Sequence, residues 1–454
     1  MSNKPDRITF QTRFEEMVGT LRKEILSSIR SAGDYLPSEL ALADQYLLSK
    51  KSVRKALDIL VSEGLIEKVP RVGNRIIKPD AEHAVTVRIG CYPSLDSESG
   101  LQELLRQFRL QHPHIQVETA ALPYTNYPDS VRGYLRSGWI DVMSLNNWNF
   151  LEMADRDALD LFEPRPPNPA PYSFLPGVFA HGGKQMAQPM LFSPVILCYN
   201  KTLFRQLQLH EPDSNWSWDR LSEVALRIRK ERGISGFYAH IASTNRFPVF
   251  LLQNGFKFNR TEDGCRFDDP LLWESLGAFR DLIHTQGPVP SFLSEGDADA
   301  EKLFAQQKTA MIMTTYYGLK YLKDLPFEYD LAPLPYTGRA RTLLLVTGLA
   351  VNRTSRHKEA AGMLVDFLCS EAAQLSLRRE TLSIPASKSA AEWEGADTMY
   401  RPSRYYMYRE IIPTFGGYEE LNITIEELDR LRSELKLFWS NLEQSESVIE
   451  RLAR

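Results

Sequence analysis

The segment LPSELALADQYLLSKKSVRKALDILVSEGLIEKVPRVGNRI, residues 36–76, decides the fold of the first part of this chain. Apolar residues at helical spacing follow Ser38, a residue type that caps helix N-termini. Ser49 precedes a second run of this kind, which ends at Gly64, as helices commonly do at glycine. Two short strand-like stretches then flank a turn that contains Gly73. The order of helix, turn, helix and hairpin predicts a winged helix-turn-helix.

The second predicted helix begins with four cations, Lys50, Lys51, Arg54 and Lys55. They form two i, i+4 pairs, so they crowd one side of the helix while apolar residues line the other. A solvated helix face is the plain alternative for such a pattern. However, cations at a helix N-terminus oppose the helix dipole, which indicates that another interaction selects them. In a winged helix-turn-helix these turns enter the major groove, where cations meet phosphates and base edges.

Residues 10–78 resemble the GntR-type winged-helix signature, which reads LPSE-x-x-LA, then S-R-x-T-V-R-x-AL-x-x-L-x-x-EGL, then a G-x-G-T wing. The sequence departs from this pattern at Leu40 and Lys50, where the family often has arginine, and at Arg71, where it has glycine. The preferred operator sequence therefore cannot be inferred from relatives, because lysine cannot donate the two parallel hydrogen bonds that a guanidinium donates. The resemblance implies these DNA-binding residues: Ser38, Ser49, Lys50, Lys51, Ser52, Arg54, Lys55, Arg71, Gly73, Asn74 and Arg75.

Charge and length support a basic end on a larger, acidic protein. The 454 residues carry a net charge of −4, yet residues 1–80 hold fourteen basic and eleven acidic residues. A basic end on an acidic chain is typical of polyanion binding, and the length predicts more than one domain. Apolar runs stay below the ~18 residues of a membrane span, and residues 1–30 lack a signal-peptide core. We expect a cytoplasmic protein that has no membrane partner.

The remainder of the chain alternates strand and helix patterns. KPDAEHA is short and polar, so we expect a head at 1–78, a linker at 79–84 and a second domain at 85–454. VTVRIGCY, IQVETAALPY and IDVMSLNN predict strands, separated by amphipathic helices. Such alternation predicts a largely parallel sheet, which binds ligands beyond the carboxyl ends of its strands. The loops at 92–96, 124–127 and 146–149 are therefore candidate ligand loops.

From about residue 85 to at least 395, the order and spacing of several segments resemble extracellular solute-binding proteins of ABC importers. Among them are SPVILCYNKTLFRQLQL, FAQQKTAMIMTTYYGL and TGLAVNRTSRHKEAAGMLVDFLCSEAAQ. The expected fold class is multidomain, with an N-terminal winged helix-turn-helix (α+β) followed by a two-lobe α/β periplasmic-binding-protein-like (type II) domain. The resemblance implies lobe one at about 85–190 and 337–382, and lobe two at about 191–336 and 383–454. The C-terminal segment predicts one or two amphipathic helices on lobe two.

Members of this family bind sugars and oligosaccharides, so aromatic and amide side chains in the cleft segments are candidate ligand contacts. Such clefts combine apolar walls with a few placed polar groups. We expect about half of the candidates to touch ligand, with Trp148 and Tyr317 foremost; core packing is the alternative for each. Trp218 is left out, because Ser217 before it is a typical N-cap. The candidates are Tyr92, Asn146, Asn147, Trp148, Tyr199, Tyr238, Asn245, Tyr316, Tyr317 and Trp393.

No catalytic, metal or cofactor motif occurs in the sequence. The four cysteines lie more than 60 residues apart and predict isolated buried thiols. His112 and His114 flank a proline and predict a turn, and Asp141 is expected to anchor its loop. We therefore expect no enzyme, no cofactor and no metal site.

The expected function is a transcription regulator that binds a double-stranded DNA operator as a homodimer and responds to a small molecule, in particular a carbohydrate. Operators mirror the two-fold symmetry of such dimers. The alternative is a GntR-headed, pyridoxal-phosphate-dependent aminotransferase-like protein. That alternative needs a Schiff-base lysine in a Ser/Thr-rich loop with a matching aspartate, and no such ordered set was found. A transport receptor would need a signal peptide.

Overall fold

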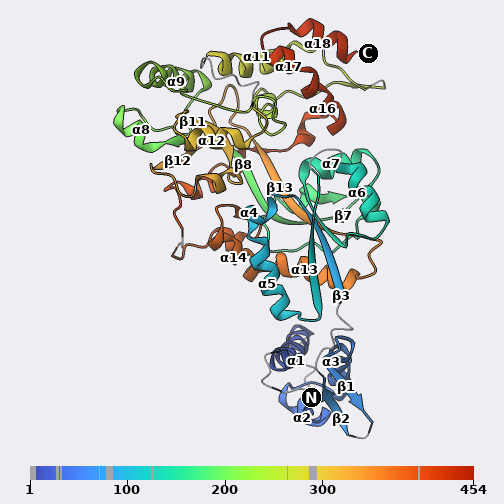
Figure 1. The fold of residues 1–454 in the computed structure, drawn as a ribbon. Coiled ribbons are helices and arrows are strands. Elements are labelled where there is room, and N and C mark those ends of the chain that lie inside the picture. The colour runs from blue at the N-terminus through green and yellow to red at the C-terminus, as the bar shows by residue number, and fades with distance from the viewer. Residues whose placement is uncertain are drawn as a thin grey trace.

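The structure is a computed structural model that describes residues 7–26, 30, 33–70, 72–77, 85–123, 127–262, 264–285, 294–396 and 399–453. It contains a small N-terminal head and a larger two-lobe domain, and the C-terminal helices lie at the end opposite the head (Figure 1). The predicted linker at 79–84 lies outside the described residues, as do residues 124–126 of one predicted ligand loop and Arg71 of the wing.

The head has the predicted order of helices and hairpin. Its elements are α1 (Arg7–Leu26), α2 (Glu39–Gln45), α3 (Lys50–Ser62) and an antiparallel hairpin of β1 (Ile66–Val69) and β2 (Gly73–Ile76). One apolar core joins the elements, because the inward faces of the three helices meet Leu65, Ile66 and Ile76.

A nine-stranded sheet runs through both lobes of the larger domain. The main path is β11 (Met311–Thr315), β8 (Gln188–Asn200), β13 (Thr342–Val351), β5 (Val142–Asn146), β3 (Val85–Cys91) and β4 (Ile115–Ala121). β3 pairs in parallel with β4 and β5, as predicted, whereas β13 and β8 are antiparallel to their neighbours on this path. β12 (Tyr329–Ala332) and β14 (Ile384–Pro385) pair with β8, and β15 (Phe415–Gly416) pairs with β13.

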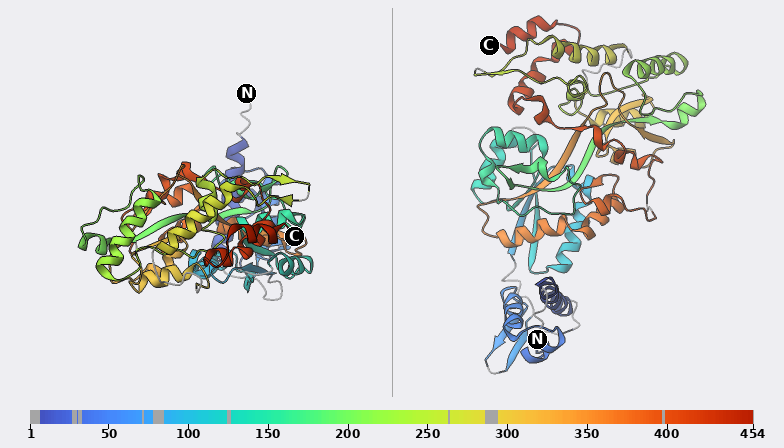
Figure 2. Two further views of the ribbon diagram at one scale, coloured as in Figure 1. Left: turned by 90° about the horizontal axis from the view of Figure 1, so that it is seen from above. Right: turned by 180° about the vertical axis from the view of Figure 1, so that it is seen from behind.

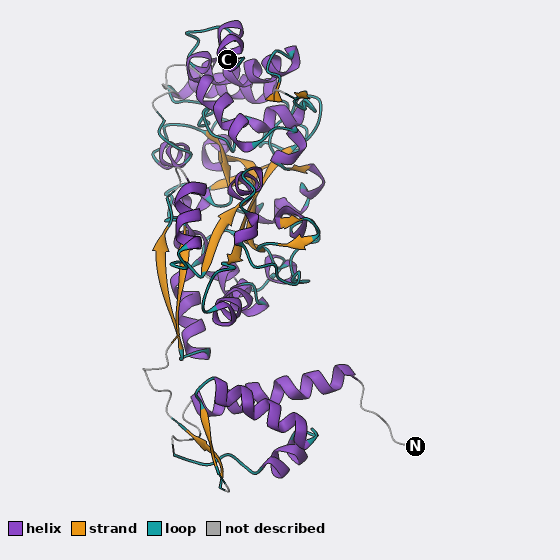
Figure 3. Ribbon diagram, turned by 90° about the vertical axis from the view of Figure 1, so that its right-hand side faces the viewer, coloured by secondary structure: helices purple, strands orange, loops and turns teal. Residues whose placement is uncertain are grey.

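β8 connects the two lobes. Residues 188–194 pair with β13, and residues 195–199 pair with β11 of lobe two. All thirteen residues of β8 are buried, because both faces of the sheet are covered. Figure 3 shows purple helices around the central strands, while other strands run along one edge of the larger domain. The chain thus passes between lobes within a continuous strand, close to the predicted crossing.

Helices cover both lobes. Lobe one carries α4 (Leu95–Ser99), α5 (Leu101–Gln111), α6 (Tyr127–Arg136), α7 (Asn147–Asp155), α13 (Lys358–Leu368) and α14 (Glu371–Glu380). Lobe two carries α8 (Lys201–Gln206), α9 (Trp218–Arg232), α10 (Pro248–Gln253), α11 (Pro270–Thr285) and α12 (Ala298–Ala305), whereas α15 (Lys388–Ala391) packs on α14 and β14. Short 3-10 helices are η2 (Leu159–Leu161), η3 (Pro176–Phe179), η5 (Gly318–Leu322), η6 (Tyr405–Arg409), η7 (Ile412–Thr414) and η8 (Tyr418–Leu421). Two small hairpins are β6 (Ala180–His181) with β7 (Lys184–Gln185), and β9 (Arg260–Thr261) with β10 (Gly264–Cys265).

The C-terminal segment forms three helices, so the prediction of one or two was wrong. They are α16 (Ile425–Glu434), α17 (Lys436–Trp439) and α18 (Ser445–Leu452). They pack on lobe two as predicted, since the Trp439 ring lies 5.9 Å from that of Phe279 on α11. Figure 2 shows this packing from behind.

Several local predictions are confirmed. Ser217 caps α9 by accepting a hydrogen bond from the Arg220 backbone N–H, and the Trp218 ring stacks on Phe250 at 4.9 Å. Asp141 anchors its loop, because its two carboxylate oxygens accept from the Arg88 backbone and the Ser355 hydroxyl.

Three cysteines are buried, but the fourth is not. Cys265 is only half-buried, which corrects the expectation of four buried thiols. Across the described ranges, no helix has the length and apolar character that a bilayer span requires.

Candidate functional site

The first candidate site is the N-terminal half of α3. Ser49 caps this helix, since its Oγ accepts from the Ser52 backbone N–H at 3.2 Å. The Ser52 side chain is buried and lies 2.8 Å from the same Oγ, so it supports the cap. Ser52 was expected to contact DNA directly; its burial corrects that expectation.

The four cations of α3 lie on its exposed face. Lys50, Lys51, Arg54 and Lys55 are exposed, while the apolar residues between them are buried in the head core. Arg54 Nε donates to Glu39 Oε2 of α2 at 2.8 Å, yet 63% of the Arg54 side chain stays exposed. This face offers positive charge and hydrogen-bond donors to a polyanion.

The wing and the start of α2 add fewer exposed donors than the sequence predicted. Asn74 is buried in the hairpin, so its side chain is not free for DNA and that expectation is corrected. Gly73 has a φ of +145°, in the region that favours glycine. Arg75 is exposed and paired with Glu67 on the opposite strand. Ser38 Oγ accepts from the Ala41 backbone N–H and caps α2.

The second candidate site is the contact between lobes at the start of α7. Asn146 caps α7, since its Oδ1 accepts from the Asn149 backbone N–H at 2.8 Å. Asn147 is buried and holds β13, because its side chain bonds to Leu344 and Val346. These two amides therefore position Trp148, whose half-buried ring meets Tyr418 of lobe two edge to face at 5.1 Å.

A hydrogen-bonded chain continues from Tyr418 into lobe two. The Tyr418 hydroxyl donates to Asn245 Oδ1 at 2.8 Å, and Asn245 Nδ2 donates to Asp297 Oδ2 at 3.3 Å. The same Asp297 oxygen lies 3.7 Å from Arg246 Nη2. An aromatic pair at the lobe boundary is thus linked to buried charges.

We call His240, Arg246, Asp297 and Glu301 the polar cluster. Arg246 and Glu301 are each only 2% exposed. Within the described residues, one buried atom of each member lacks a hydrogen-bond partner: His240 Nδ1, Arg246 Nη1, Asp297 Oδ1 and Glu301 Oε2. Burial raises the pKa of Glu301 and lowers the pKa of His240. Buried polar atoms without hydrogen-bond partners lower the stability of the fold, so their presence marks the polar cluster as a candidate functional site.

The cluster supplies both donors and acceptors. A guanidinium donates hydrogen bonds, and carboxylates accept them. A hydroxyl group can do both, so this set suits the hydroxyls of a neutral ligand. Sequence reasoning missed the polar cluster, because its members come from two segments about 50 residues apart and carry no shared motif.

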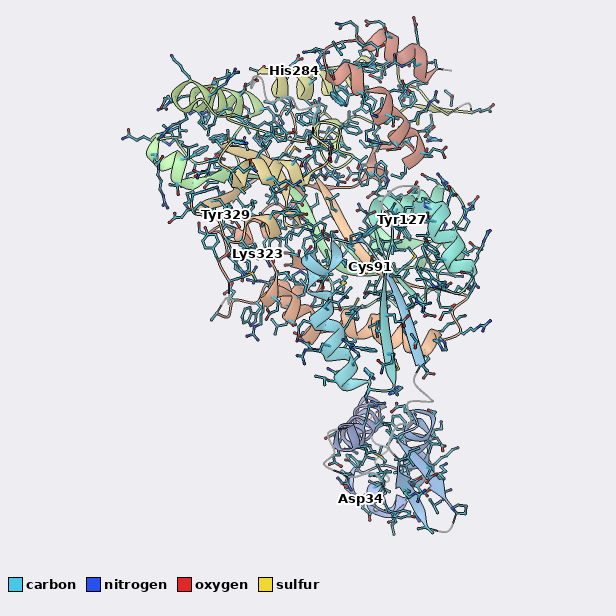
Figure 4. The ribbon with its side chains drawn as sticks, viewed as in Figure 1. Asp34, Cys91, Tyr127, His284, Lys323 and Tyr329 are labelled. Carbon is cyan, nitrogen blue, oxygen red and sulfur yellow. The ribbon has the colours of Figure 1, made fainter. Side chains whose placement is uncertain are left out.

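The other predicted ligand residues fall into three groups. Tyr92 is buried, and its hydroxyl donates to Asn149 Oδ1 of α7; the Tyr317 hydroxyl donates to the Leu191 carbonyl of β8 at 3.2 Å. Tyr238 is almost buried and precedes the polar cluster in the chain. Trp393 lies instead beside the guanidinium groups of Arg378 and Arg379. Figure 4 marks the carboxyl end of β3 by Cys91, next to Tyr92.

Tyr199 and Tyr316 do not line the cleft, which corrects the expectation for both. Each is fully buried. The Tyr199 hydroxyl donates to Glu211 Oε2, and the Tyr316 hydroxyl donates to the Tyr405 carbonyl, both at 2.7 Å. Strands covered on both faces bury aromatic residues irrespective of alternation, so their position near a strand end misled the prediction.

A surface depression on lobe one lies away from both candidate sites. Arg88, Trp139 and His357 are among its lining residues. It opens at the amino ends of the parallel strands, whereas ligands of such sheets bind at the carboxyl ends. In the described part of the chain, no group of histidine, cysteine and acidic side chains is arranged to hold a metal ion.

The geometry defines a DNA-binding head joined to a two-lobe binding domain, and family comparisons agree. Residues 14–76 match the bacterial regulatory proteins of the gntR family. Residues 92–375 match the bacterial extracellular solute-binding protein family. The second match spans more than half of the chain, so the chain belongs to the solute-binding family. The aminotransferase-like alternative is wrong, because the solute-binding domain takes up that region.

Two curated relatives are similar to parts of the chain. The probable transcriptional regulator PhnF of Escherichia coli (strain K12) is 34% identical over 65 residues, or 14% of this chain and 27% of PhnF. The sn-glycerol-3-phosphate-binding periplasmic protein UgpB of Brucella abortus (strain 2308) is 27% identical over 179 residues, or 36% of this chain and 40% of UgpB. The chain therefore spans less than half the length of either relative.

Solved structures show the same two-lobe fold. An ABC substrate-binding protein from Listeria monocytogenes, in complex with cycloalternan, gives a TM-score of 0.67 at 19% identity and covers 81% of this chain and 97% of its own. Maltose-bound MalE3 of T. maritima gives 0.67 at 22% identity, with 82% and 98% covered. At these identities the likeness concerns the fold alone.

Proposed function

We propose that this protein is a cytoplasmic transcription regulator. Its head would bind a double-stranded DNA operator as a homodimer, and its two-lobe domain would bind a sugar or oligosaccharide that changes operator affinity. The observation that carries the proposal is the joining, in one chain, of an exposed cationic helix face to a solute-binding domain with an aromatic and polar contact between its lobes.

The exposed face of α3 supports DNA binding. Its cations begin at the helix N-terminus, the part of a recognition helix that reaches base edges and phosphates. Arg54 is the best candidate for a base contact, because its guanidinium can donate two parallel hydrogen bonds. Lys50, Lys51 and Lys55 would supply point charges to phosphates, and Arg75 would do so from the wing.

The polar cluster and the aromatic pair support a neutral carbohydrate. The ligands named for the similar proteins are sn-glycerol 3-phosphate, cycloalternan and maltose. Two carboxylates accompany the single guanidinium of the polar cluster, and they would repel a phosphate. The half-buried Trp148, whose ring packs on the buried Tyr418, offers a ring on which a sugar can stack. These features favour sugars over phosphate esters.

Ligand would act by selecting the closed arrangement of the lobes. A ligand that binds one of two arrangements more tightly shifts their populations by its differential affinity. If the heads of a dimer fit the operator in one arrangement only, operator affinity changes by the same coupling factor.

The first experiment is a thermal-shift screen of the whole protein with maltose, maltotriose and sn-glycerol 3-phosphate. A ligand that binds only the folded state raises Tm by mass action. We expect a neutral sugar to raise Tm. A rise with sn-glycerol 3-phosphate alone would overturn the sugar assignment.

The second experiment measures operator affinity by fluorescence anisotropy, using DNA selected by the protein, with and without the active sugar. We expect the sugar to change affinity. Arg54→Ala should weaken operator binding about tenfold to a hundredfold, since a good base contact contributes ~1–3 kcal/mol. Arg227→Ala, on an exposed face of α9, is the matched control. Operator affinity unchanged in Arg54→Ala would contradict the proposed docking.

A further inference from the structure

An ion pair joins the two lobes at a contact separate from Trp148. Lys320 Nζ of η5 donates to Glu98 Oε1 of α4 at 2.9 Å. The Glu98 side chain is 13% exposed and the Lys320 side chain 11%, so both charges are removed from water. Desolvation raises the pKa of Glu98, while Lys320 and the Ser94 hydroxyl oppose that rise.

The two partners belong to different lobes. α4 follows the carboxyl end of β3 and packs on α5 in lobe one. η5 follows β11 and packs on α12 in lobe two. Tyr317 immediately precedes η5, and its hydroxyl bonds to the backbone of β8 and β13, the strands shared by the two lobes. The pair therefore sits beside the strands about which the lobes are joined.

The contacts made by α7 with lobe two are of a different kind. There the Trp148 and Tyr418 rings meet, and the Ile425 backbone N–H of α16 donates to Asp155 of α7 at 2.8 Å. Those contacts are aromatic or involve a backbone donor. The Glu98–Lys320 pair instead brings two full side-chain charges together across the lobe boundary.

The burial of this pair depends on the relative position of the lobes. If the lobes separate, each charge returns to water and loses little. If they stay together and one partner is removed, the other charge is left buried without a counter-charge, which is strongly unfavourable. Removing one partner therefore acts on the closed arrangement alone. Removing both leaves no buried charge and is close to neutral.

We propose that Glu98 and Lys320 form an interlobe latch that sets the balance between closed and open arrangements of the two-lobe domain before any ligand binds. The latch positions the lobes and does not itself identify the ligand. It rests on the two-lobe fold, so it holds or fails independently of the sugar assignment.

The experiment compares the whole protein with Glu98→Gln, Lys320→Met, the double variant E98Q/K320M and the charge-reversed E98K/K320E. The radius of gyration from small-angle X-ray scattering, without ligand, reports the closed fraction. Circular dichroism checks that each variant is folded. Glu103→Gln is the matched control, because Glu103 forms an exposed pair with Arg106 on neighbouring α5.

We expect each single variant to lower the closed-to-open ratio by about tenfold or more and to enlarge the radius of gyration. E98Q/K320M should lie within about threefold of the wild-type ratio, since the energies of contacting groups do not add. E98K/K320E should recover part of the loss. A wild-type radius in both single variants, or a double variant that shows the sum of the single losses, would overturn the latch.

A second readout separates this inference from the proposed function. If the sugar found by thermal shift binds the closed arrangement, its affinity should fall in the single variants in step with the closed fraction. If no sugar binds but the radius responds as expected, the latch stands and the sugar assignment fails. If sugar binds and the radius of gyration is the same in every variant, the sugar assignment stands and the latch fails.

Discussion

The head and the lobe boundary use charge in opposite ways. In the head, cations stand in water on one face of α3, and the Arg54–Glu39 pair is largely exposed. At the lobe boundary, Arg246 is 2% exposed and its Nη1 has no hydrogen-bond partner among the described residues. Exposed charges can change binding while stability stays the same. Removing one member of a buried charge pair, in contrast, lowers the free energy of unfolding.

The largest expected effect is at Arg246. Arg246→Leu leaves the buried Glu301 and the partly exposed Asp297 without their cation, so it should lower the free energy of unfolding by about 3 kcal/mol. Urea unfolding of the whole protein, followed by circular dichroism, measures the change. The exposed Arg227→Ala variant should change it by less than about 0.5 kcal/mol. Equal free energies of unfolding in the two variants would show that the buried Arg246 contributes no more to stability than an exposed arginine.

The next effect is at Trp148. Trp148→Ala removes the ring that meets Tyr418, and sugar affinity should fall about tenfold to a hundredfold, or ~1.4–2.8 kcal/mol. Isothermal titration with the sugar found by thermal shift measures this. Operator affinity without sugar should stay unchanged, because Trp148 is remote from the head in the chain and in the fold. A variant that binds sugar normally would show that the aromatic pair is only a packing contact.

A smaller effect is expected at Lys55. If Lys55 neutralises one phosphate, Lys55→Ala should weaken operator and unrelated DNA alike and reduce the salt slope of binding by about 1. Anisotropy titrations at several salt concentrations measure the slope. The melting temperature should not change, since this side chain is exposed. An unchanged salt slope would mean that Lys55 contacts no phosphate and is only a solvent-exposed residue of the helix.

The smallest effect concerns the His112 turn at the end of α5. Burial, with smaller contributions from Arg22 and His114, lowers the pKa of His112 to about 4, whereas an unfolded histidine titrates near 6.5. The unfolded state therefore takes up the proton first, and stability is lost as pH falls from 6.5 toward 4. Because His112 is partly exposed, the loss between pH 7 and 5 should be only about 0.5–1 kcal/mol. Urea unfolding at the two pH values should show a smaller loss in His112→Asn; an identical loss would assign the acid sensitivity elsewhere.

The two regions also differed in how well the sequence predicted them. In the head, Ser38, Ser49 and Gly64 mark helix ends where the structure has them, because capping depends on residues a few positions apart. The burial of Ser52 and Asn74 was not predicted, because the pattern of apolar residues does not indicate which polar residues face the core. Local rules therefore sufficed for the helices and fell short for individual contacts.

At the lobe boundary the sequence predicted the fold and only part of the candidate site. Asn146, Trp148 and Asn245 lie in the connected set, whereas Tyr199 and Tyr316 are core residues. The polar cluster was missed altogether. Its members meet Trp148 only through Tyr418, which lies 270 residues further along the chain.

What the sequence determined by itself is the succession of elements: a capped cationic helix, a hairpin, and alternating strands and helices of a two-lobe binding domain. These elements follow from hydrogen bonding and apolar periodicity over a few residues, so they depend on residues that are close in the chain. Only the tertiary structure decided which charges lost their water. Arg246, Glu301, Glu98 and Lys320 acquire their roles when distant segments exclude solvent around them, and burial, unlike helix capping, cannot be read from neighbours in the chain.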